Sequence, residues 1–334
     1  MRDSITRLLW PLMALALLLA FNAVASPAFF HWRLAEGRLA SPLIDVLNQG
    51  APVMLLALGM TLVIAAGGID LSVGAVMAMA GAVAAHLLQH DGSVAVAIAA
   101  ALAVCLAAGL WNGLLITLAG VPPIVATLIL MVAGRGIAQL ITDGQIITVE
   151  PESAFLAIGR GTALGLPAPV LIALVATLAL SAAVRFTSLG LFIECIGGNE
   201  EASRYAGLDV RSIRLAAYAI MGLLAGLAGL IDTADIAAAD ANNSGLYLEL
   251  DAILAVVIGG TALTGGRFSL LGSLIGAILI QSLSTTILMA EFGGRSVPVE
   301  LNLVIKAAVV LIVCLLQSSE LRRRLLLVTR RPGA

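Results

Sequence analysis

Ile193 to Arg214 reads IECIGGNEEASRYAGLDVRSIR, and this stretch decides how the chain can be arranged in space. It is the longest strongly polar run, and the apolar runs on both sides are long enough to cross a bilayer. A charged side chain at the centre of a bilayer costs about 2.5–3.5 kcal/mol on insertion scales, so this run cannot lie in hydrocarbon. We therefore predict a water-facing segment that a partner outside the membrane contacts.

The composition of the whole chain agrees with a membrane protein. Of its 334 residues, 60% are hydrophobic and 11% are charged, with a mean hydropathy of +1.08. Soluble domains carry about 25% charged residues. The apolar residues form long runs without regular alternation, which favours spanning helices over a β-barrel. We predict an all-α polytopic membrane protein in which residues 1–334 form a single transmembrane domain.

The apolar runs predict about ten spanning helices, with at least one of them broken. The predicted spans are residues 8–25, 44–66, 71–88, 94–118, 124–141, 168–184, 215–231, 252–263, 270–289 and 301–316. Ala23-Val24-Ala25 resembles a signal-peptide cleavage site, but a retained first helix is the favoured interpretation because many spans follow. The second, third and eighth spans are candidates for half-helices or re-entrant segments.

Ten spans place both termini on the same side of the membrane. Arg2 and Arg7 precede the first span, and a basic tail at 318–334 follows the last one. Arginine and lysine are enriched in cytoplasmic segments, so both termini are expected in the cytoplasm. The same count makes residues 185–214 a cytoplasmic segment.

The sequence Gly67-Gly68-Ile69-Asp70-Leu71-Ser72 interrupts an otherwise continuous apolar stretch. Glycines free the backbone, and Asp70 or Ser72 can cap a new helix that starts near Leu71. Broken helices at membrane depth expose polar backbone groups to the cargo of transporters. Two interpretations of this segment therefore stay open: part of a translocation path that includes Asp70 and Ser72, or a plain turn at the membrane interface.

Other polar residues inside the apolar runs are candidates for the same path. They are Trp111, Asn112, Arg135, Gln139 and Asp251. An intramembrane arginine needs a partner or water, and an exposed tryptophan face can stack on a sugar. The competing interpretations are an internal salt bridge, a buried amide and, for Asp251, a carboxylate placed favourably at a helix N-terminus.

The chain carries no fingerprint of an ATP-hydrolysing or other catalytic protein. It has no G-x-x-x-x-G-K-[ST] motif, and its only lysine, Lys306, lies in the tenth predicted span. Neither a nucleophile–base pair nor a metal-ligand spacing of histidine and cysteine occurs. We therefore expect a protein that has no enzymatic activity, binds no metal or cofactor and has no nucleic-acid partner. Membrane lipid is expected to surround the chain.

Three long motifs, in this order, resemble a known family. They are GGIDLSVGA at 67–75, GGNEEASRYAGLDV at 197–210 and ELDAILAVVIGGTALTGG at 249–266. They resemble the permeases of bacterial ABC-type monosaccharide importers of the ribose, xylose and galactose class. Within that class, PPIVATLILMVAGRGIAQLIT at 122–142 and ADANNSGLYLELDAILAVVIGG at 239–260 are similar to a galactofuranose importer permease.

The resemblance implies a permease of the bacterial inner membrane that works with several partners. A cytoplasmic ABC ATPase binds ATP and supplies energy, a second permease, identical or homologous, completes the path, and a periplasmic binding protein delivers a monosaccharide such as galactofuranose. The coupling segment is expected at residues 185–214, within which residues 193–214 resemble the family's segment with the E-A-A-x-x-x-G motif; Ser203 replaces the second alanine. The residues expected to couple to the ATPase are Gly197, Gly198, Glu200, Glu201, Ala202, Arg204 and Gly207.

One alternative from another class stays open at this point. An ion-coupled secondary carrier would use Asp70, Arg135 and Asp251 as relay groups for protons or sodium. Intramembrane carboxylates are compatible with that mechanism. A charged cytoplasmic segment of this kind is not required by it.

Overall fold

The computed structural model describes residues 2–25, 33–35, 38–289, 291–292, 295–296, 303–308 and 311, and these residues are mostly helical. The helices are α1 (Arg2–Ala25), α2 (Pro42–Ala65), α3 (Val73–Gln89), α4 (Val94–Thr117), α5 (Pro123–Ile141), α6 (Ala157–Arg160), α7 (Ala168–Phe186), α8 (Leu189–Gly198), α9 (Glu200–Tyr205), α10 (Val210–Ile236), α11 (Leu248–Ile258) and α12 (Leu270–Met289), with a 3-10 turn at Ala154–Leu156.

Six of the helices in the described part of the chain are long and apolar enough to cross a membrane. They are α2, α4, α5, α7, α10 and α12, and shorter apolar helices occur at Leu9–Val24, Val73–Gln89 and Leu189–Gly198. This confirms a polytopic helical protein but not the expected number of ten spans. Each predicted span from 8–25 to 270–289 overlaps a helix. The tenth, 301–316, falls largely outside the described residues.

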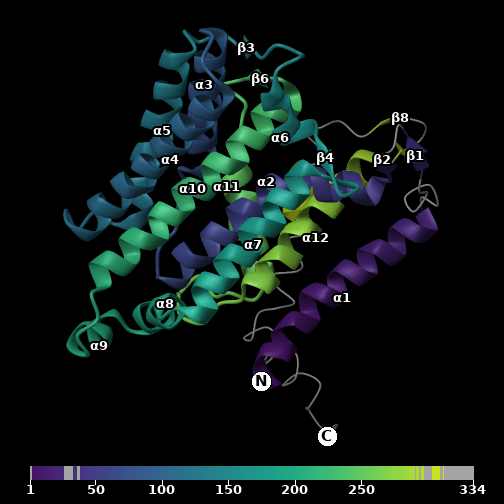
Figure 1. Ribbon diagram of the computed structural model, residues 1–334. Helices are drawn as coiled ribbons and strands as arrows, with labels where there is room; N and C mark the ends of the chain where they lie inside the picture. The colour runs from purple at the N-terminus through teal and green to yellow at the C-terminus, as the bar shows by residue number, and fades with distance from the viewer. Residues whose placement is uncertain are drawn as a thin grey trace, which may run out of the picture.

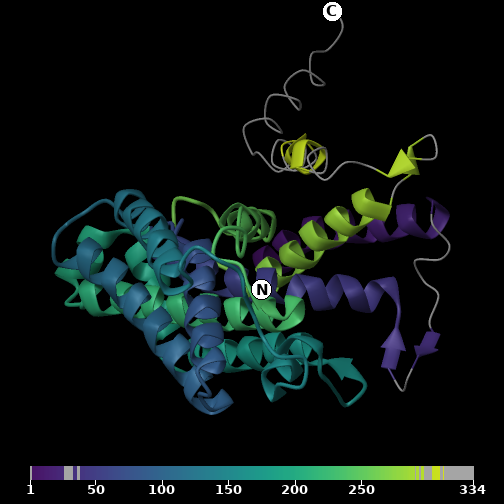
Figure 2. The ribbon, with the colours of Figure 1, turned by 90° about the horizontal axis from the view of Figure 1, so that it is seen from above.

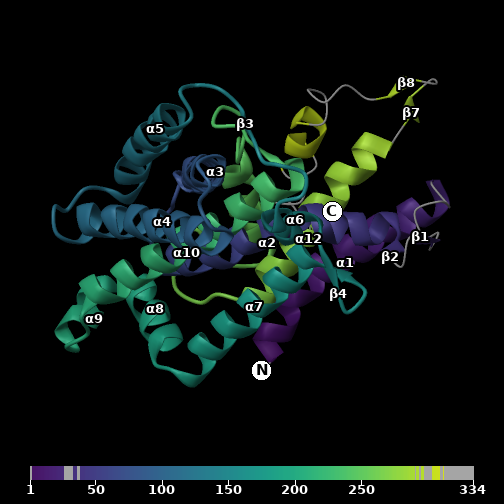
Figure 3. The ribbon, with the colours of Figure 1, turned by 45° about the horizontal axis from the view of Figure 1, so that its top comes forward.

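Helix α2 forms the centre of the bundle. Every residue from 50 to 66 is buried, as expected for a helix that is apolar on all sides. Helix α10 packs against α2, α3 and α4, while α12 packs against α1, α2 and α11. In Figures 2 and 3, α4 and α5 lie on one side of this centre and α1 on the other.

Small residues allow the central helices to approach closely. A β-carbon added to Gly109 would lie 2.3 Å from the carbonyl oxygen of Tyr218 and 3.1 Å from the α-carbon of Gly222. Such backbone contact is the usual basis of helix association in lipid, where the hydrophobic effect provides little driving force. The packing of α4 on α10 therefore depends on glycine at this crossing.

The chain leaves α2 at Ala65 and begins α3 only at Val73, so residues 66–72 form the break that was predicted at 67–72. Gly67 has φ +81°, a left-handed conformation that disfavours other residues. The break lies beside Tyr218, the ninth residue of the 27-residue α10, and therefore alongside a span and not beyond its end. Helix α11 has only 11 residues, in agreement with its expected short length.

Four two-stranded pairs of very short strands were not predicted. β1 (Arg33–Ala35) pairs with β2 (Arg38–Ala40), β3 (Ile147–Thr148) with β6 (Ala238–Ala239), β4 (Thr162–Ala163) with β5 (Leu166–Pro167), and β7 (Glu291–Phe292) with β8 (Arg295–Ser296). Strands of two or three residues carry no readable alternation. Figure 1 shows α8, α9 and the α4–α5 connection at one end of the bundle, and β3, β6 and α6 at the opposite end.

Candidate functional site

The predicted coupling segment folds into two short helices joined at Asn199. Helix α8 ends at Gly198, Asn199 is extended, and α9 begins at Glu200. The Asn199 side chain accepts a hydrogen bond of 2.9 Å from the backbone amide of Ala202, as a helix N-cap does. The hydroxyl of Ser203, the residue that departs from the family motif, donates to the Asn199 carbonyl at 2.8 Å. Local hydrogen bonds thus define the start of α9.

The backbone conformation of Gly207 gives the physical reason for the glycine in the E-A-A-x-x-x-G motif. It has φ +84°, its amide donates to the carbonyl of Arg204, and the amide of Leu208 donates to the carbonyl of Ser203. This is a Schellman motif, which favours glycine at the left-handed position. A β-carbon at Gly207 would meet open space, so a larger residue there acts through the backbone conformation and not through a clash.

Helix α9 presents an exposed surface at the end of the bundle. Glu201, Ala202 and Arg204 are exposed, and so is Tyr205. Ser203 faces the protein and is buried. The residues predicted to contact an ATPase are therefore accessible, while one residue of the same turn anchors the helix.

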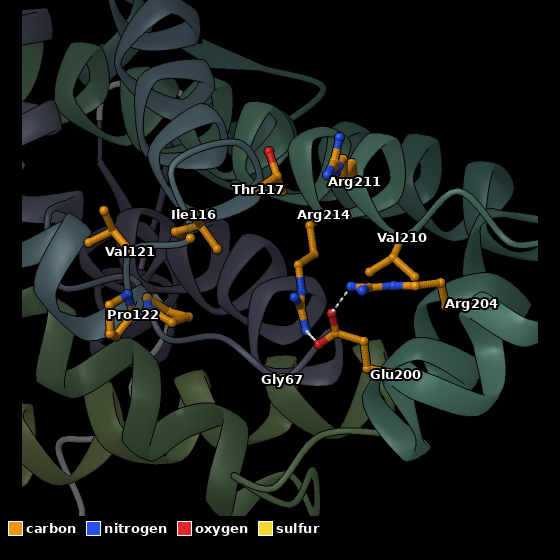
Figure 4. A pocket seen from close by; sticks show the side chains of 12 residues that line it. Gly67, Ile116, Thr117, Val121, Pro122, Glu200, Arg204, Val210, Arg211 and Arg214 are labelled. Atoms are coloured by element: carbon orange, nitrogen blue, oxygen red, sulfur yellow. Dashed lines mark hydrogen bonds and ion pairs between the residues drawn. The ribbon is translucent and has the colours of Figure 1, made fainter.

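Glu200 joins α9 to the start of α10. Its carboxylate contacts Arg204 at 2.9 Å within α9 and Arg214 at 2.6 Å on α10 (Figure 4). Arg214 also donates from Nε to the carbonyl of Ala66 at 3.4 Å, just beyond the end of α2. Arg214 is not among the residues predicted from the sequence to couple to the ATPase. The structure places its side chain between the coupling segment and the break.

A second contact joins the segment to the end of α2. A β-carbon at Gly197 would lie 1.7 Å from the carbonyl oxygen of Ala65 and 2.4 Å from the amide nitrogen of Gly266. The Gly266 amide donates to that same carbonyl at 2.9 Å. Three segments distant in sequence therefore meet backbone to backbone at Ala65. Gly198, by contrast, faces open space.

A buried polar cluster occupies the break after α2. Asp70 is 2% exposed, and its Oδ1 accepts from the amide of Ser72 at 2.9 Å and from the Ser72 hydroxyl at 2.6 Å. The side-chain amide of Asn112 donates to the Ser72 hydroxyl at 2.9 Å, which links α4 to the break. The Asn112 Oδ1 is buried without a hydrogen-bond partner in the described part of the chain. Asp70 and Ser72, predicted together at the break, and Asn112, a further candidate for the same path, thus lie together.

Trp111 and Asn112 are neighbours in sequence but point to different surroundings. Asn112 is fully buried, whereas Trp111 is 53% exposed on the outside of α4. We expect Asn112→Ala to lower stability by about 0.5–1.5 kcal/mol, because one buried hydrogen bond is lost. Trp111→Leu is the matched control and should change stability little. Thermal unfolding of both purified variants measures the difference, and equal losses would contradict this division.

Arg135 and Gln139 lie at another place, where they hold the connection between α10 and α11. Arg135 donates from Nη1 to the carbonyls of Ala241, at 3.0 Å, and Ser244, at 2.7 Å. Gln139 donates to the Asn242 side chain at 2.7 Å. Their partners are therefore in one loop, and neither residue hydrogen-bonds to the cluster at the break in the described structure.

Asp251 forms an ion pair with Lys306 at 2.9 Å, with both side chains largely buried. The position of the only lysine inside an apolar run was visible in the sequence, but its partner was not. The pair joins α11 to the helical residues 303–308. Asp251 thus has a structural partner, and its predicted place on the translocation path stays a prediction.

Comparison with known proteins identifies the class. Residues 42–314 match the family model described as the permease component of a branched-chain amino acid transport system. This range includes the break, the coupling segment and α11. The chain therefore belongs to this family of membrane permeases, and it is a transport subunit without an enzymatic activity of its own.

Individual relatives align over nearly the whole chain. The galactofuranose transporter permease protein of Escherichia coli strain K12 is 51% identical over 320 residues, covering 94% of this chain and 92% of that protein. The fructose import permease protein of Bifidobacterium longum is 40% identical over 324 residues, covering 95% and 89%. The ribose import permease protein of E. coli K12 is 36% identical over 312 residues, covering 92% and 93%. These similarities do not support the ion-coupled carrier considered above.

Proposed function

We propose that this chain forms the membrane path for a monosaccharide, galactofuranose or a closely related sugar, in an ATP-driven importer. The relatives at 51%, 40% and 36% identity are named for galactofuranose, fructose and ribose. The family description names a branched-chain amino acid transport system, whereas these individual relatives are named for sugars. The individual relatives, which match nearly end to end, support the choice of a sugar.

The observation that carries the proposal is the connection from an exposed helix to the break beside a span. Helix α9 is accessible, Glu200 links it through Arg214 to the carbonyl of Ala66, and Gly197 lies against the carbonyl of Ala65. A displacement of α9 by a partner is therefore transmitted to the backbone at the end of α2. The break that holds Asp70 and Ser72 begins at Ala66.

This arrangement fits a division of labour between subunits. A cytoplasmic ABC ATPase binds and hydrolyses ATP and moves the coupling segment 185–214. A periplasmic binding protein delivers the sugar, and a second permease, identical or homologous, forms the other half of the path. The positive-inside distribution supports cytoplasmic placement of both termini, of the coupling segment and of the 318–334 tail.

Transport in vesicles tests the energy source. The full complex of permeases, ATPase and binding protein is reconstituted, and uptake of labelled galactofuranose is compared with that of fructose and ribose. We expect uptake to require enclosed ATP and the binding protein, and to persist when an ionophore removes ion gradients. A non-hydrolysable ATP analogue is the control. Uptake by this chain alone, driven by a proton or sodium gradient, would refute the proposal.

A further inference from the structure

A cavity of about 380 Å³ lies between the α4–α5 connection and the start of α10. Figure 4 shows two different sides. One side is apolar and consists of Ile116, Val121 and Pro122. The charged residues project from α9 and α10. The charged lining residues are Glu200, Arg204, Arg211 and Arg214.

The charges in this cavity are not balanced. Three arginines face a single carboxylate, so the formal charge of the lining is +2, from three positive charges less one negative charge. Glu200 already accepts from both Arg204 and Arg214. Arg211 forms no salt bridge within the described residues. Arg211 interacts electrostatically with the exposed carboxylate of Asp209, which does not line the cavity. Within the lining, guanidinium donors exceed the carboxylate acceptors, and their planar fork matches the oxygens of a phosphate group.

The apolar side of the cavity continues onto the outer surface of two spans. Leu118, after the end of α4, is 66% exposed, and Ile124 and Val125 in the first turn of α5 are 48% and 47% exposed. The cavity thus lies where these spans end, at the level expected for lipid headgroups. Basic pockets between spanning helices at this level suit anionic headgroups. A free inorganic anion would use the arginines but not this apolar surface.

We propose that the cavity binds the phosphate group of an anionic phospholipid, with the acyl chains lying along the ends of α4 and α5. The phosphate contacts Arg211 and the outer faces of Arg204 and Arg214. This site goes beyond transport of the sugar and does not depend on which sugar is carried. Because Arg214 also donates to the carbonyl of Ala66, just beyond the end of α2, a bound lipid stabilises the arginine that connects the coupling segment to the bundle.

Native mass spectrometry of the full-length chain in detergent tests the site with phosphatidylglycerol and phosphatidylcholine as probes. We expect preferential retention of phosphatidylglycerol. Arg211→Gln should weaken that retention about fivefold, the loss expected for one arginine at an anionic surface. Arg211→Lys keeps the charge and should retain most of the binding. Arg267→Gln removes an exposed arginine from the connection between α11 and α12, which does not line the cavity, and is the matched control.

Three results would overturn the proposal. Equal loss of phosphatidylglycerol in Arg211→Gln and Arg267→Gln would show a general charge effect. Displacement of the lipid by excess inorganic phosphate, with the same dependence on Arg211, would assign the site to free phosphate. Unchanged lipid retention in Arg211→Gln, together with weaker co-purification of the ATPase, would identify the cavity as a protein contact. Circular dichroism of each variant checks that the fold is intact.

Discussion

Gly197→Ala is expected to reduce sugar uptake to background. The added methyl group would lie 1.7 Å from the Ala65 carbonyl oxygen and 2.4 Å from the Gly266 amide nitrogen, and both neighbours are backbone atoms that cannot rotate away. Overpacking of this kind costs about 1–3 kcal/mol, and occasionally more. The coupling segment must therefore move away from the end of α2, and the connection that the proposed mechanism needs is lost.

A glycine outside the coupling segment provides the control. Gly136→Ala, within helix α5, places the same methyl group in open space, and Gly136 has no positive φ, so uptake should stay close to that of the unmodified protein. Uptake by the reconstituted complex and the amount of chain in the membrane are measured for both variants. If Gly197→Ala transports normally, or if Gly136→Ala fails equally, the close contact at Ala65 is not what transmits the movement.

Glu201→Lys is expected to abolish uptake by a different route. Glu201 is exposed on α9 and forms no salt bridge among the described residues, unlike its neighbour Glu200. Charge reversal therefore leaves the internal contacts of the chain in place. At an interface, like charges brought together cost several kcal/mol, so binding of the ATPase should fall about tenfold or more.

Co-purification of the ATPase with the permease measures this effect directly, and uptake measures its consequence. The control is Glu152→Lys, which reverses an exposed charge near the 3-10 turn at the other end of the bundle. Both variants should insert into the membrane in normal amounts. Normal ATPase binding by Glu201→Lys would remove Glu201 from the proposed docking surface.

The sequence could predict the local structure of the coupling segment but not how the segment attaches to the bundle. The helix α9, its N-cap and its glycine terminus follow from local residue types, because Asn199 and Gly207 act on backbone groups within a few positions. The attachment of that helix to the bundle does not. Arg214 and Ala66 are far apart in sequence, and no local pattern relates them.

Helix α4 shows why the sequence could identify polar-site residues but could not predict which way their side chains face. It is apolar on almost all sides, so the hydrophobic pattern does not indicate which face is buried. Successive residues on a helix differ by about 100° in direction. Trp111 and Asn112 were therefore predicted as one site, although only Asn112 reaches the cluster at the break.

The sequence by itself determined the class of this protein. Whether a segment can lie in lipid depends on its composition over some 20 consecutive residues, so the sequence alone predicts it. This applies to the long apolar runs, the glycine-rich break at 67–72 and the polar segment at 193–214. Only the tertiary structure decided which polar groups meet. Glu200 with Arg214, Asp251 with Lys306, and Asn112 with Ser72 are pairs between distant segments. Their partners are set by how helices pack, and helices that are apolar all round leave that packing open until the backbones come into contact.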